Sequence, residues 1–328
     1  MPHRIAKQIF NTIIKSNRIL LIPHRNPDGD ALGSVASFMQ YLRSIGKPHT
    51  AFCETPITTR LQYLPHLDYI TNDTSVWDDP SYDLVIVFDS GDLRYAGVSD
   101  YIGRGSTKRK LINIDHHPTN EMFGDYNLVI PKASSTTEIL YHFFKYNNVN
   151  IDSDIATCLL TGLVTDTDNF TNAATSITSY SISSDLISRG GNLNMIRGWV
   201  FKDKSINALK LWGTVLSRLT KHEELDIVYT YLTREDLEEH TVDEAEADGL
   251  ANFLNSIGDG RAGLILKELP NGQLKGSFRT THDGVNVSNF SLLFGGGGHK
   301  KAAGFTIDGP KDVAFAKIFS AIIEFEKK

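Results

Sequence analysis

Three short apolar runs in the first half of the chain each lead directly into acidic or imidazole side chains. The runs cover residues 19–23, 84–88 and 110–114 and are apolar at most positions. Strands buried on both faces have this composition, so the runs predict a parallel sheet with helices on both faces. Ligands of open α/β sheets bind at the carboxyl ends of the strands. The polar side chains that follow the runs are therefore expected to meet at one edge.

Six side chains that can bind metal stand at or near predicted strand and helix ends. They are His24, Asp28 and Asp30 after the first run, Asp89 after the second, His116 after the third, and Asp166 after the stretch 158–165. Taken alone, Asp28 or Asp30 could simply cap a helix that starts near Ala31. Oxygen and imidazole donors that recur in four separate segments instead favour one metal site assembled from distant parts of the chain.

The charge of these ligands predicts two divalent cations. Four carboxylates gathered without cations would repel one another and take up protons. Mixed oxygen and imidazole ligation without thiolate suits Mn²⁺ best, ahead of Mg²⁺, Co²⁺ or Fe²⁺, while Zn²⁺ usually takes fewer ligands. Two cations about 3.5–4 Å apart polarise a phosphorus centre and deprotonate a bridging water. The predicted reaction is phosphoester hydrolysis by in-line attack.

Composition excludes several classes of protein. The net charge of −6 lacks the basic excess with which proteins bind long duplex nucleic acid, so it favours a small phosphate substrate. No apolar run approaches the ~20 residues of a membrane span. Apolar residues near the N-terminus are spaced for an amphipathic helix rather than a signal peptide. Two unpaired cysteines, Cys53 and Cys158, fit the reducing cytoplasm.

Sequence patterns divide the chain into two α/β domains joined by a helical linker. The predicted boundaries are 1–192 for the metal-binding domain, 193–222 for the linker, and 223–328 for a smaller domain. Helices are predicted over 32–45, 136–146, 155–164, about 203–221 and 244–256, and strands over 226–232, 262–268 and 274–279. Residues 241–244 fit a capping box for the last helix. Asn271-Gly272 fits a hairpin turn.

A glycine run marks the smaller domain. Four glycines, Gly295–Gly298, precede His299 and would let backbone N–H groups approach an anion, although a flexible loop is the alternative. Arg279 ends a predicted strand and can bind phosphate through its guanidinium group. Arg261 and His282 could contribute, but each also fits an ordinary surface position.

The same residues resemble the motifs of a known family, the DHH phosphoesterases. The matching segments are His24-Arg25-Asn26-Pro27-Asp28-Gly29-Asp30, Asp89-Ser90-Gly91, Asp115-His116-His117 and Thr165-Asp166-Thr167, in the order of the family. The segment from Gly295 to Phe305 resembles the DHH-associated domain. The resemblance covers nearly the whole chain. It implies a catalytic DHH domain over 1–192 and a DHH-associated substrate-binding domain over 223–328, facing each other across a cleft.

The resemblance also implies a role for each residue. One metal would be held by His24, Asp28, Asp89 and Asp166, and the other by Asp30, Asp89, His116 and Asp166. Asp115 would orient a histidine, and His117 would touch the scissile phosphate or the leaving oxygen. The second domain would hold the substrate through Arg279, Gly296, Gly297, Gly298 and His299. Relatives usually carry glycine where this chain has Asp168, which could bind an extra water or repel substrate.

Size and domain architecture resemble the nanoRNase group of the family. This group hydrolyses short oligoribonucleotides and removes the 3′-phosphate from adenosine 3′,5′-bisphosphate (pAp). The implied function is therefore a Mn²⁺-dependent phosphoesterase for short oligoribonucleotides or nucleotide bisphosphates, with a homodimer left open. One alternative is a soluble phosphodiesterase for cyclic di-AMP or its linear product pApA. Another, suggested by Asp168, is a metal-dependent nucleotide sensor without catalysis.

Overall fold

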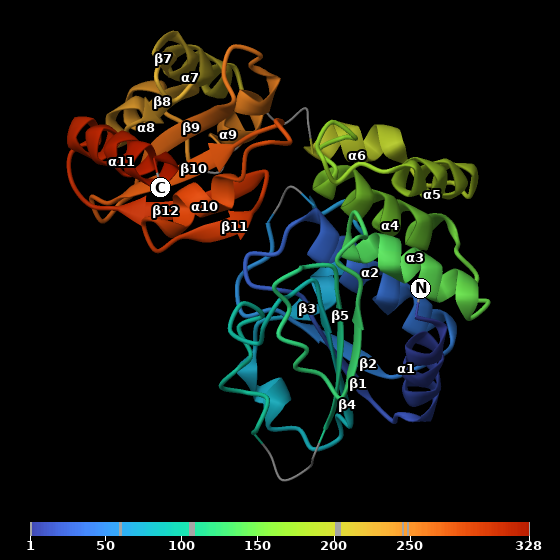
Figure 1. Cartoon of the computed structure of the whole chain (residues 1–328). Helices are drawn as coiled ribbons and strands as arrows, with labels where there is room; N and C mark the ends of the chain where they lie inside the picture. The colour runs from blue at the N-terminus through green and yellow to red at the C-terminus, as the bar shows by residue number, and fades with distance from the viewer. Residues whose placement is uncertain are drawn as a thin grey trace. The chain divides into compact units, whose positions relative to one another are not determined.

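The structure is a computed structural model that describes residues 2–58, 61–104, 109–200, 205–244, 246–247 and 249–327. The chain divides into two compact units, Met1–Lys202 and Asp203–Lys328, drawn from blue to yellow-green and from yellow to red in Figure 1. Each unit contains its own sheet and its own hydrophobic core. The first two residues of the helix predicted over 203–221 lie outside the described residues.

A six-stranded sheet forms the centre of the first unit, in the order β3-β2-β1-β4-β5-β6. Its strands are β1 (Ile19–Ile22), β2 (His49–Phe52), β3 (Ile70–Thr71), β4 (Leu84–Phe88), β5 (Lys110–Asp115) and β6 (Tyr126–Val129). Every neighbouring pair is parallel, as predicted. The three apolar runs form the adjacent inner strands β1, β4 and β5, where β1 and β4 are buried at every residue.

One face of this sheet is covered by helices. The helices of the first unit are α1 (His3–Lys15), α2 (Gly29–Ser44), α3 (Thr136–Tyr146), α4 (Ser153–Asp166), α5 (Ile177–Ser188) and α6 (Leu193–Val200). Apolar residues of α1 to α4 pack against alternate strand residues such as Ile86 and Phe88. The predicted helices over 32–45, 136–146 and 155–164 are confirmed. Helix α5, which was not predicted, packs on the outside of α4 (Figure 1).

The other face of the sheet has a different cover. Val85 and Val87 of β4 point into a second core that includes Phe52, Trp77 and Val98. Trp77 belongs to the 3₁₀ helix η3 (Thr74–Trp77), and within the described residues this core contains no α-helical residue. The prediction of helices on both faces is therefore wrong for this face. Large aromatic side chains from loops bury enough strand surface to replace a helix.

Helices α2 and α4 lie unusually close together. A Cβ added at Gly33 of α2 would stand 2.5 Å from the carbonyl oxygen of Cys158 in α4. A Cβ at Gly162 of α4 would overlap the side chains of Asp30 and Thr137. Only glycine therefore fits at both positions. This close approach brings the first turn of α2 near the last turn of α4, where Asp30 and Asp166 are found.

The second unit contains a mixed six-stranded sheet in the order β11-β12-β10-β9-β8-β7. Its strands are β7 (Thr220–His222), β8 (Ile227–Leu232), β9 (Ala262–Glu268), β10 (Leu274–Arg279), β11 (Gly297–His299) and β12 (Ala302–Ile307). Strands β8 and β9 are parallel and the other pairs antiparallel. The strands predicted over 226–232, 262–268 and 274–279 are confirmed. Gly272, with φ +80°, forms the predicted turn between β9 and β10.

Helices cover both faces of this second sheet. They are α7 (Ile206–Ser217), α8 (Arg234–His240), α9 (Leu250–Phe253), η4 (Leu254–Ser256), α10 (Val287–Leu292) and α11 (Lys311–Glu326). One core joins the sheet to α10 and α11, and another joins it to α7, α8 and α9. Among the described residues of the whole chain, none of the helices combines the length and apolar character that crossing a membrane requires.

The helix predicted over 244–256 is shorter than expected, and its capping box is wrong. Thr241 has φ +53° and ends α8, and the described helical residues of this stretch begin only at Leu250. The observed capping box lies earlier, where the Thr233 side chain accepts from the backbone of Asp236 and the Asp236 side chain accepts from that of Thr233. Both segments share the same local pattern. The structure forms the first of these two caps, at the start of α8.

Candidate metal centre

The polar residues that follow the inner strands meet at the carboxyl edge of the first sheet. His24 follows β1, Asp89 directly follows β4, and Asp115 ends β5. The first turn of α2 adds Asp30 and the last residue of α4 is Asp166. This is the edge at which open α/β sheets bind ligands. The six predicted ligands are therefore brought together by the topology of the sheet and by the contact between α2 and α4.

The donor atoms lie within a few ångströms of one another. His24 Nε2 is 3.7 Å from Asp28 Oδ1 and 3.6 Å from Asp89 Oδ2. His116 Nε2 is 3.5 Å from Asp89 Oδ1 and 3.2 Å from Asp166 Oδ2. Asp89 thus faces both histidines, one with each carboxylate oxygen. The donors form three groups that could each hold a metal. These are His24, Asp28 and Asp89; Asp30, His116 and Asp166; and Asp89, His116 and His117.

The two histidines at the ends of the cluster are oriented by backbone carbonyls. His24 Nδ1 is 2.7 Å from the carbonyl oxygen of Arg25, and His116 Nδ1 is 3.3 Å from that of Ala133. A carbonyl oxygen only accepts hydrogen bonds, so each Nδ1 carries the proton and donates it. When the ring is neutral, each Nε2 then has a lone pair that faces the carboxylates. This is the neutral form in which imidazole binds metals.

Asp28 also has the capping role considered as an alternative. Its Oδ1 accepts from the backbone N–H groups of Asp30 and Ala31, at 3.0 and 3.1 Å. The same oxygen faces His24, so capping α2 and joining the cluster are compatible. The cap fixes the first turn of α2, and this fixes the position of Asp30 beside it.

The N-terminus of α3 holds two of the carboxylates in place. The backbone N–H groups of Thr136 and Thr137 donate to the two oxygens of Asp30, at 2.6 and 2.9 Å. The Thr136 hydroxyl donates to Asp89 Oδ1 at 3.0 Å. Unpaired N–H groups at a helix start favour negative charge. The sequence indicated only that this segment begins a helix, because backbone donors leave no trace in side-chain patterns.

His117 belongs to the group with Asp89 and His116, but its shortest contact is with Asp115. Its Nδ1 is 2.7 Å from Asp115 Oδ1, and Asn120 donates to the other oxygen of Asp115 at 2.6 Å. Burial opposes protonation of His117, but the hydrogen bond and charge of Asp115 outweigh it and raise the pKa of His117. Asp115 is fully buried, so its charge requires both partners.

The electrostatics of the cluster fit bound cations. Burial and the charges of Asp30 and Asp28 hold the pKa of Asp89 well above its usual range. The same causes raise the pKa of Asp166 well above its usual range. Both shifts mean that the protein alone provides too little positive charge for these carboxylates. Divalent cations would supply it, and oxygen and imidazole donors are the ligands such cations take. The residues therefore fit a metal centre.

Comparison with known families assigns both units. Residues 18–163 match the DHH family, N-terminal domain, and residues 224–328 match the DHHA1 domain. The chain belongs to the DHH family. Two relatives are each named bifunctional oligoribonuclease and PAP phosphatase NrnA. The relative from Thermus thermophilus is 29% identical over 98% of this chain and 93% of its own, and that from Bacillus subtilis 26% identical over 92% of each.

A solved structure shows the same fold. It is an exopolyphosphatase-related protein from Bacteroides fragilis, with a TM-score of 0.90 and 24% sequence identity. The similarity covers 99% of this chain and 97% of that protein. The predicted α/β fold class is thereby confirmed.

Asp168 stands where the family resemblance implies a glycine. This residue has φ +49°, and Asn169 and Phe170 follow with φ +55° and +66°. After Thr167, which has φ −87°, three successive residues are thus left-handed, a conformation that glycine adopts without steric cost. A glycine, which the family resemblance implies at this position, would therefore have a conformational reason. Asp168 does not occur in any of the donor groups found among the described residues.

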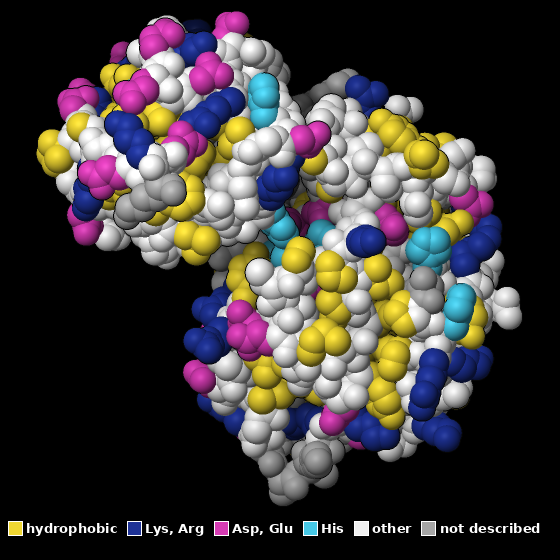
Figure 2. Space-filling model, in the orientation of Figure 1, with side chains coloured by type: hydrophobic (Ala, Val, Ile, Leu, Met, Phe, Trp, Pro, Cys, Tyr) yellow, Lys and Arg dark blue, Asp and Glu magenta, His cyan; other side chains and the backbone are white. Residues whose placement is uncertain are grey.

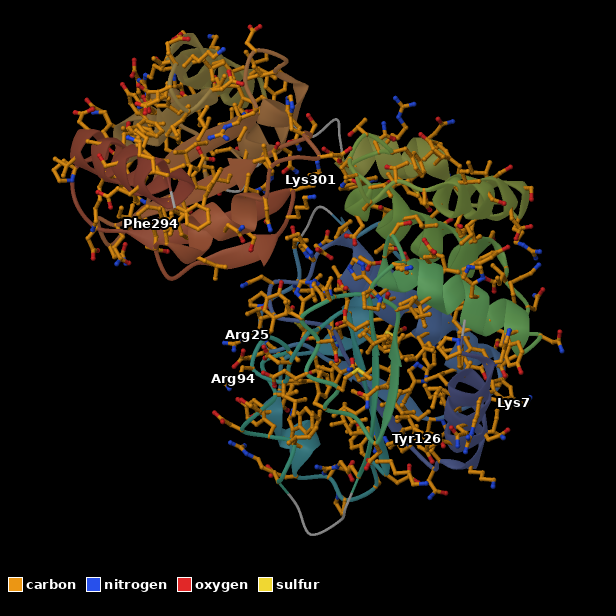
Figure 3. All side chains as sticks on the ribbon, viewed as in Figure 1. Lys7, Arg25, Arg94, Tyr126, Phe294 and Lys301 are labelled. Atoms are coloured by element: carbon orange, nitrogen blue, oxygen red, sulfur yellow. The ribbon has the colours of Figure 1, made fainter. Side chains whose placement is uncertain are left out.

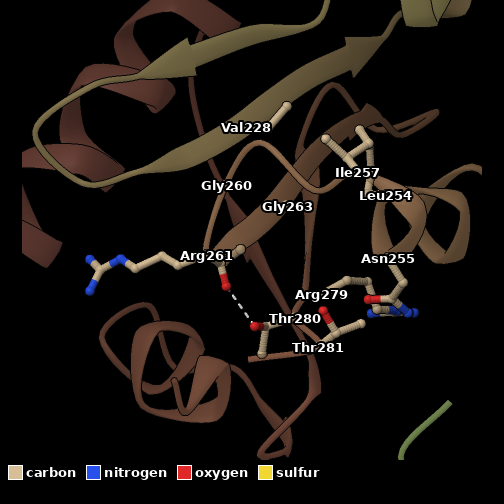
Figure 4. Close-up of a pocket in the computed structure, with 11 residues that line it drawn as sticks. Val228, Leu254, Asn255, Ile257, Gly260, Arg261, Gly263, Arg279, Thr280 and Thr281 are labelled. Atoms are coloured by element: carbon tan, nitrogen blue, oxygen red, sulfur yellow. Dashed lines mark hydrogen bonds between the residues drawn. The ribbon is translucent and has the colours of Figure 1, made fainter. Parts of the chain in front are cut away.

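In the DHHA1 domain, Arg279 and His299 lie on β10 and β11, the two strands on either side of β12. Both residues pair with Ala302 of β12, Arg279 from β10 and His299 from β11. Directly paired residues of antiparallel strands project from the same face of a sheet. Arg279 and His299 therefore share one face. Arg279 Nε donates to the Asn252 side chain at 2.9 Å, and Figure 4 shows Arg279 beside Asn255 and Thr281.

Two of the four glycines before His299, Gly297 and Gly298, belong to strand β11 and not to a loop. Gly297 and Gly298 pair with Gly304 and Ala303 in β12. A Cβ on Gly296 would overlap the Gly304 backbone, and Gly298 has φ +140°. Close packing of β11 on β12 therefore requires glycine at Gly296 and Gly298, whereas a Cβ on Gly297 would meet no atom within 4 Å. The flexible loop considered as an alternative is not what the structure shows for Gly297 and Gly298.

Arg261, considered as a further substrate-binding residue, is engaged elsewhere. Its Nε donates to the carbonyl of Leu225 at 2.6 Å, and its Nη2 pairs with Glu326 at 2.7 Å. In Figure 4 its side chain extends away from Arg279. Arg261 thus ties the start of β9 to the last turn of α11, which is a structural role.

Proposed function

We propose that this phosphoester hydrolase of the DHH family hydrolyses short oligoribonucleotides to mononucleotides and removes the 3′-phosphate from pAp. The observation that carries the proposal is the position of Asp89, whose two oxygens face His24 and His116 and link two donor groups. The relatives named oligoribonuclease and PAP phosphatase support the substrate class. They align with this chain over more than nine tenths of its length.

The cofactor that we propose is a pair of Mn²⁺ ions. One would be held by His24, Asp28, Asp89 and Asp166, and the other by Asp30, Asp89, His116 and Asp166. When bound, two such cations supply charge that polarises the phosphate and lowers the pKa of a water for attack. The mixed oxygen and imidazole donors favour Mn²⁺ over Mg²⁺, which prefers oxygen ligands.

Residues of the chain itself would complete the reaction. The hydrogen bond to Asp115 leaves Nε2 of His117 to contact the scissile phosphate or the leaving oxygen. Thr136 and Thr137 would keep Asp89 and Asp30 in place through the contacts that they already make. In the DHHA1 domain Arg279, Gly296, Gly297, Gly298 and His299 would bind the parts of the substrate beyond the scissile bond.

We expect activity to fall as oligoribonucleotides lengthen beyond about five residues, because the chain lacks the basic excess that holds a long strand. On the face of the DHHA1 domain seen in Figure 2, Lys and Arg side chains alternate with Asp and Glu. The measurement is kcat/KM with Mn²⁺ on pAp, on RNAs of increasing length, on pApA and on cyclic di-AMP. Equal rates on a trinucleotide and on a long single strand would contradict the proposal.

The same panel separates the alternatives. A clear preference for cyclic di-AMP or pApA over both pAp and short RNA would replace the proposal with a dinucleotide phosphodiesterase. Tight nucleotide binding without turnover of any substrate would indicate a sensor. Substitution Asp168→Gly then tests whether Asp168 limits activity, since glycine is the residue that the family resemblance implies here and suits the φ of +49°.

Replacing Arg279 with alanine should weaken binding of substrates that carry a second phosphate. We expect a loss of about 1.5–3 kcal/mol for pAp, the usual range for a hydrogen bond to a charged group. The loss should be small for bis-nitrophenyl phosphate, which has only the scissile phosphate. The measurement is KM for both substrates, together with the Mn²⁺ content of the variant, which should equal that of the wild type.

Arg261→Ala is a matched control for this variant. It removes a guanidinium group from the same domain, but one that is bound by Leu225 and Glu326. Its KM for pAp should be that of the wild type. An equal loss on pAp and on bis-nitrophenyl phosphate in Arg279→Ala would mean that Arg279 acts at the scissile phosphate itself.

A further inference from the structure

Tyr95 is an exposed aromatic residue that lies directly against the metal centre. Its ring stacks on the imidazole of His24, with ring centroids 4.8 Å apart and an angle of 26° between the planes. The residue is nevertheless 48% exposed. One face of the ring covers His24, so the exposed part comprises the opposite face and the ring edge. An aromatic surface is therefore open to solvent beside the candidate metal ligands.

Hydrogen bonds hold the backbone of Tyr95 in place, while its ring rests against His24. Tyr95 N–H donates to Asp92 Oδ1 at 2.7 Å, and Tyr95 C=O accepts from the N–H of Arg25 at 3.1 Å. The Ser90 hydroxyl donates to the carbonyl of Asp92 at 2.8 Å. These bonds tie the residue to the segments that carry His24 and Asp89. A ligand that stacks on a ring already held in position loses little entropy on binding.

The surroundings of the ring combine cations and carboxylates. Burial and the charges of Asp28 and Asp89 raise the pKa of Tyr95 to about 12, so its hydroxyl is neutral at physiological pH. Two exposed arginines, Arg25 and Arg94, stand on the same edge of the DHH domain (Figure 3). The Arg25 guanidinium donates to the carbonyl of Arg94 and pairs with Glu54 at 3.1 Å.

We propose that the exposed face of Tyr95 stacks on the nucleobase of the nucleotide whose phosphate is bound at the metal centre. The proposal rests on the proposed function, since it names the group that the site recognises beyond phosphate. Stacking on an aromatic ring accepts any base, because every base has a π-face. Tyr95 would thus select nucleotides over simple phosphate esters without selecting a sequence. Arg25 and Arg94 would add positive charge at the edge of this surface.

The test compares two ligands that differ only in the base, adenosine 5′-monophosphate and ribose 5-phosphate. Their dissociation constants are measured by calorimetry with Mn²⁺ present, for the wild type and for Tyr95→Ala, Tyr95→Phe and Tyr95→Trp. We expect the wild type to bind adenosine 5′-monophosphate about tenfold or more tightly than ribose 5-phosphate. The ratio should fall close to one in Tyr95→Ala and persist in the phenylalanine and tryptophan variants.

Tyr69→Ala is the matched control, because Tyr69 is an exposed tyrosine of the same domain that contacts Arg43 and His66 instead of His24. Its ratio should equal that of the wild type. Equal weakening of both ligands in Tyr95→Ala would mean that Tyr95 only supports His24, and it would overturn the proposal. An unchanged ratio of the two dissociation constants in Tyr95→Ala would also overturn the proposal. Loss of that ratio in Tyr95→Phe would overturn it as well, because it would show that the hydroxyl and not the ring makes the difference.

Calorimetry keeps this proposal separate from the proposed function. Binding of the two ligands is measured without turnover, so the ratio is defined even if pAp and short RNA are not hydrolysed. Failure of hydrolysis in the wild type would contradict the proposed function, while a base-dependent ratio that needs the aromatic ring would still support a nucleotide site at Tyr95.

Discussion

Replacing Asp89 with alanine or asparagine is expected to abolish hydrolysis. Its two oxygens lie 3.6 Å from His24 Nε2 and 3.5 Å from His116 Nε2, so its loss affects both donor groups. Asp89 has φ +55°, a conformation that asparagine tolerates better than alanine. Asp89→Asn therefore removes the charge without adding backbone strain. The measurements are kcat on pAp at saturating Mn²⁺ and the metal content of each variant.

A carboxylate at the other end of the same strand provides the control for the Asp89 variants. Asp83 stands at the opposite end of β4, where its oxygens accept from the backbone of Asn17 and Arg18. Asp83→Ala should leave kcat close to that of the wild type, at some cost in stability. If Asp89→Asn kept more than about a tenth of the wild-type kcat, equivalent to less than ~1.4 kcal/mol of barrier, Asp89 would not be the shared ligand that we propose.

Replacing Gly162 with alanine should destabilise the DHH domain and disrupt the metal centre together. The added Cβ would overlap the side chains of Asp30 and Thr137, both fully buried. Overpacking a closely packed core typically lowers the free energy of unfolding by about 1–3 kcal/mol. Because the added Cβ would clash with a carboxylate that is held in place, we expect a loss of about 3 kcal/mol for this variant. The same displacement moves Asp30 from the N–H groups of α3. Chemical denaturation and Mn²⁺ titration measure the two effects.

Gly198→Ala is the control for this substitution, at a position where an added Cβ has space. Gly198 lies in α6 of the same unit, and a Cβ there would meet no atom within 4 Å. Alanine is a better helix former, so this variant should be about 0.5–1 kcal/mol more stable than the wild type. If Gly162→Ala were as stable as Gly198→Ala, the close contact of α2 with α4 would not constrain the site.

The sequence predicted the position of the candidate ligands because strand ends can be read from it. The apolar runs before His24 and Asp89 end where β1 and β4 end, and a parallel sheet brings such ends to one edge. The contacts that hold the ligands were not predictable. Asp30 accepts from the N–H groups of Thr136 and Thr137, more than a hundred positions along the chain, and every residue except proline has such a group.

The smaller domain shows the limit of local patterns. Thr233 to Asp236 and Thr241 to Glu244 both have the threonine and acidic residue of a capping box. The structure uses only the first, since Thr241 ends the helix that Thr233 begins. Apolar residues after both patterns are buried in the same core, Leu237 after the first and Ala247 and Leu250 after the second. The tetrapeptide alone therefore does not determine which pattern forms a cap.

The order in which the cluster's segments leave the ribosome has a consequence for biosynthesis. Strand β1, with His24, is made early, whereas α4, with Asp166 at its end, is made only after all six strands of the sheet. Until α4 is complete, the edge already holds His24, His116 and the N–H donors of α3, but it lacks Asp166 and the contact of α4 with α2. A nascent chain therefore presents an acidic, half-formed edge, and capture of the metal should coincide with the docking of α4 on α2. Metal supply would then act on the yield of folded protein as well as on its activity.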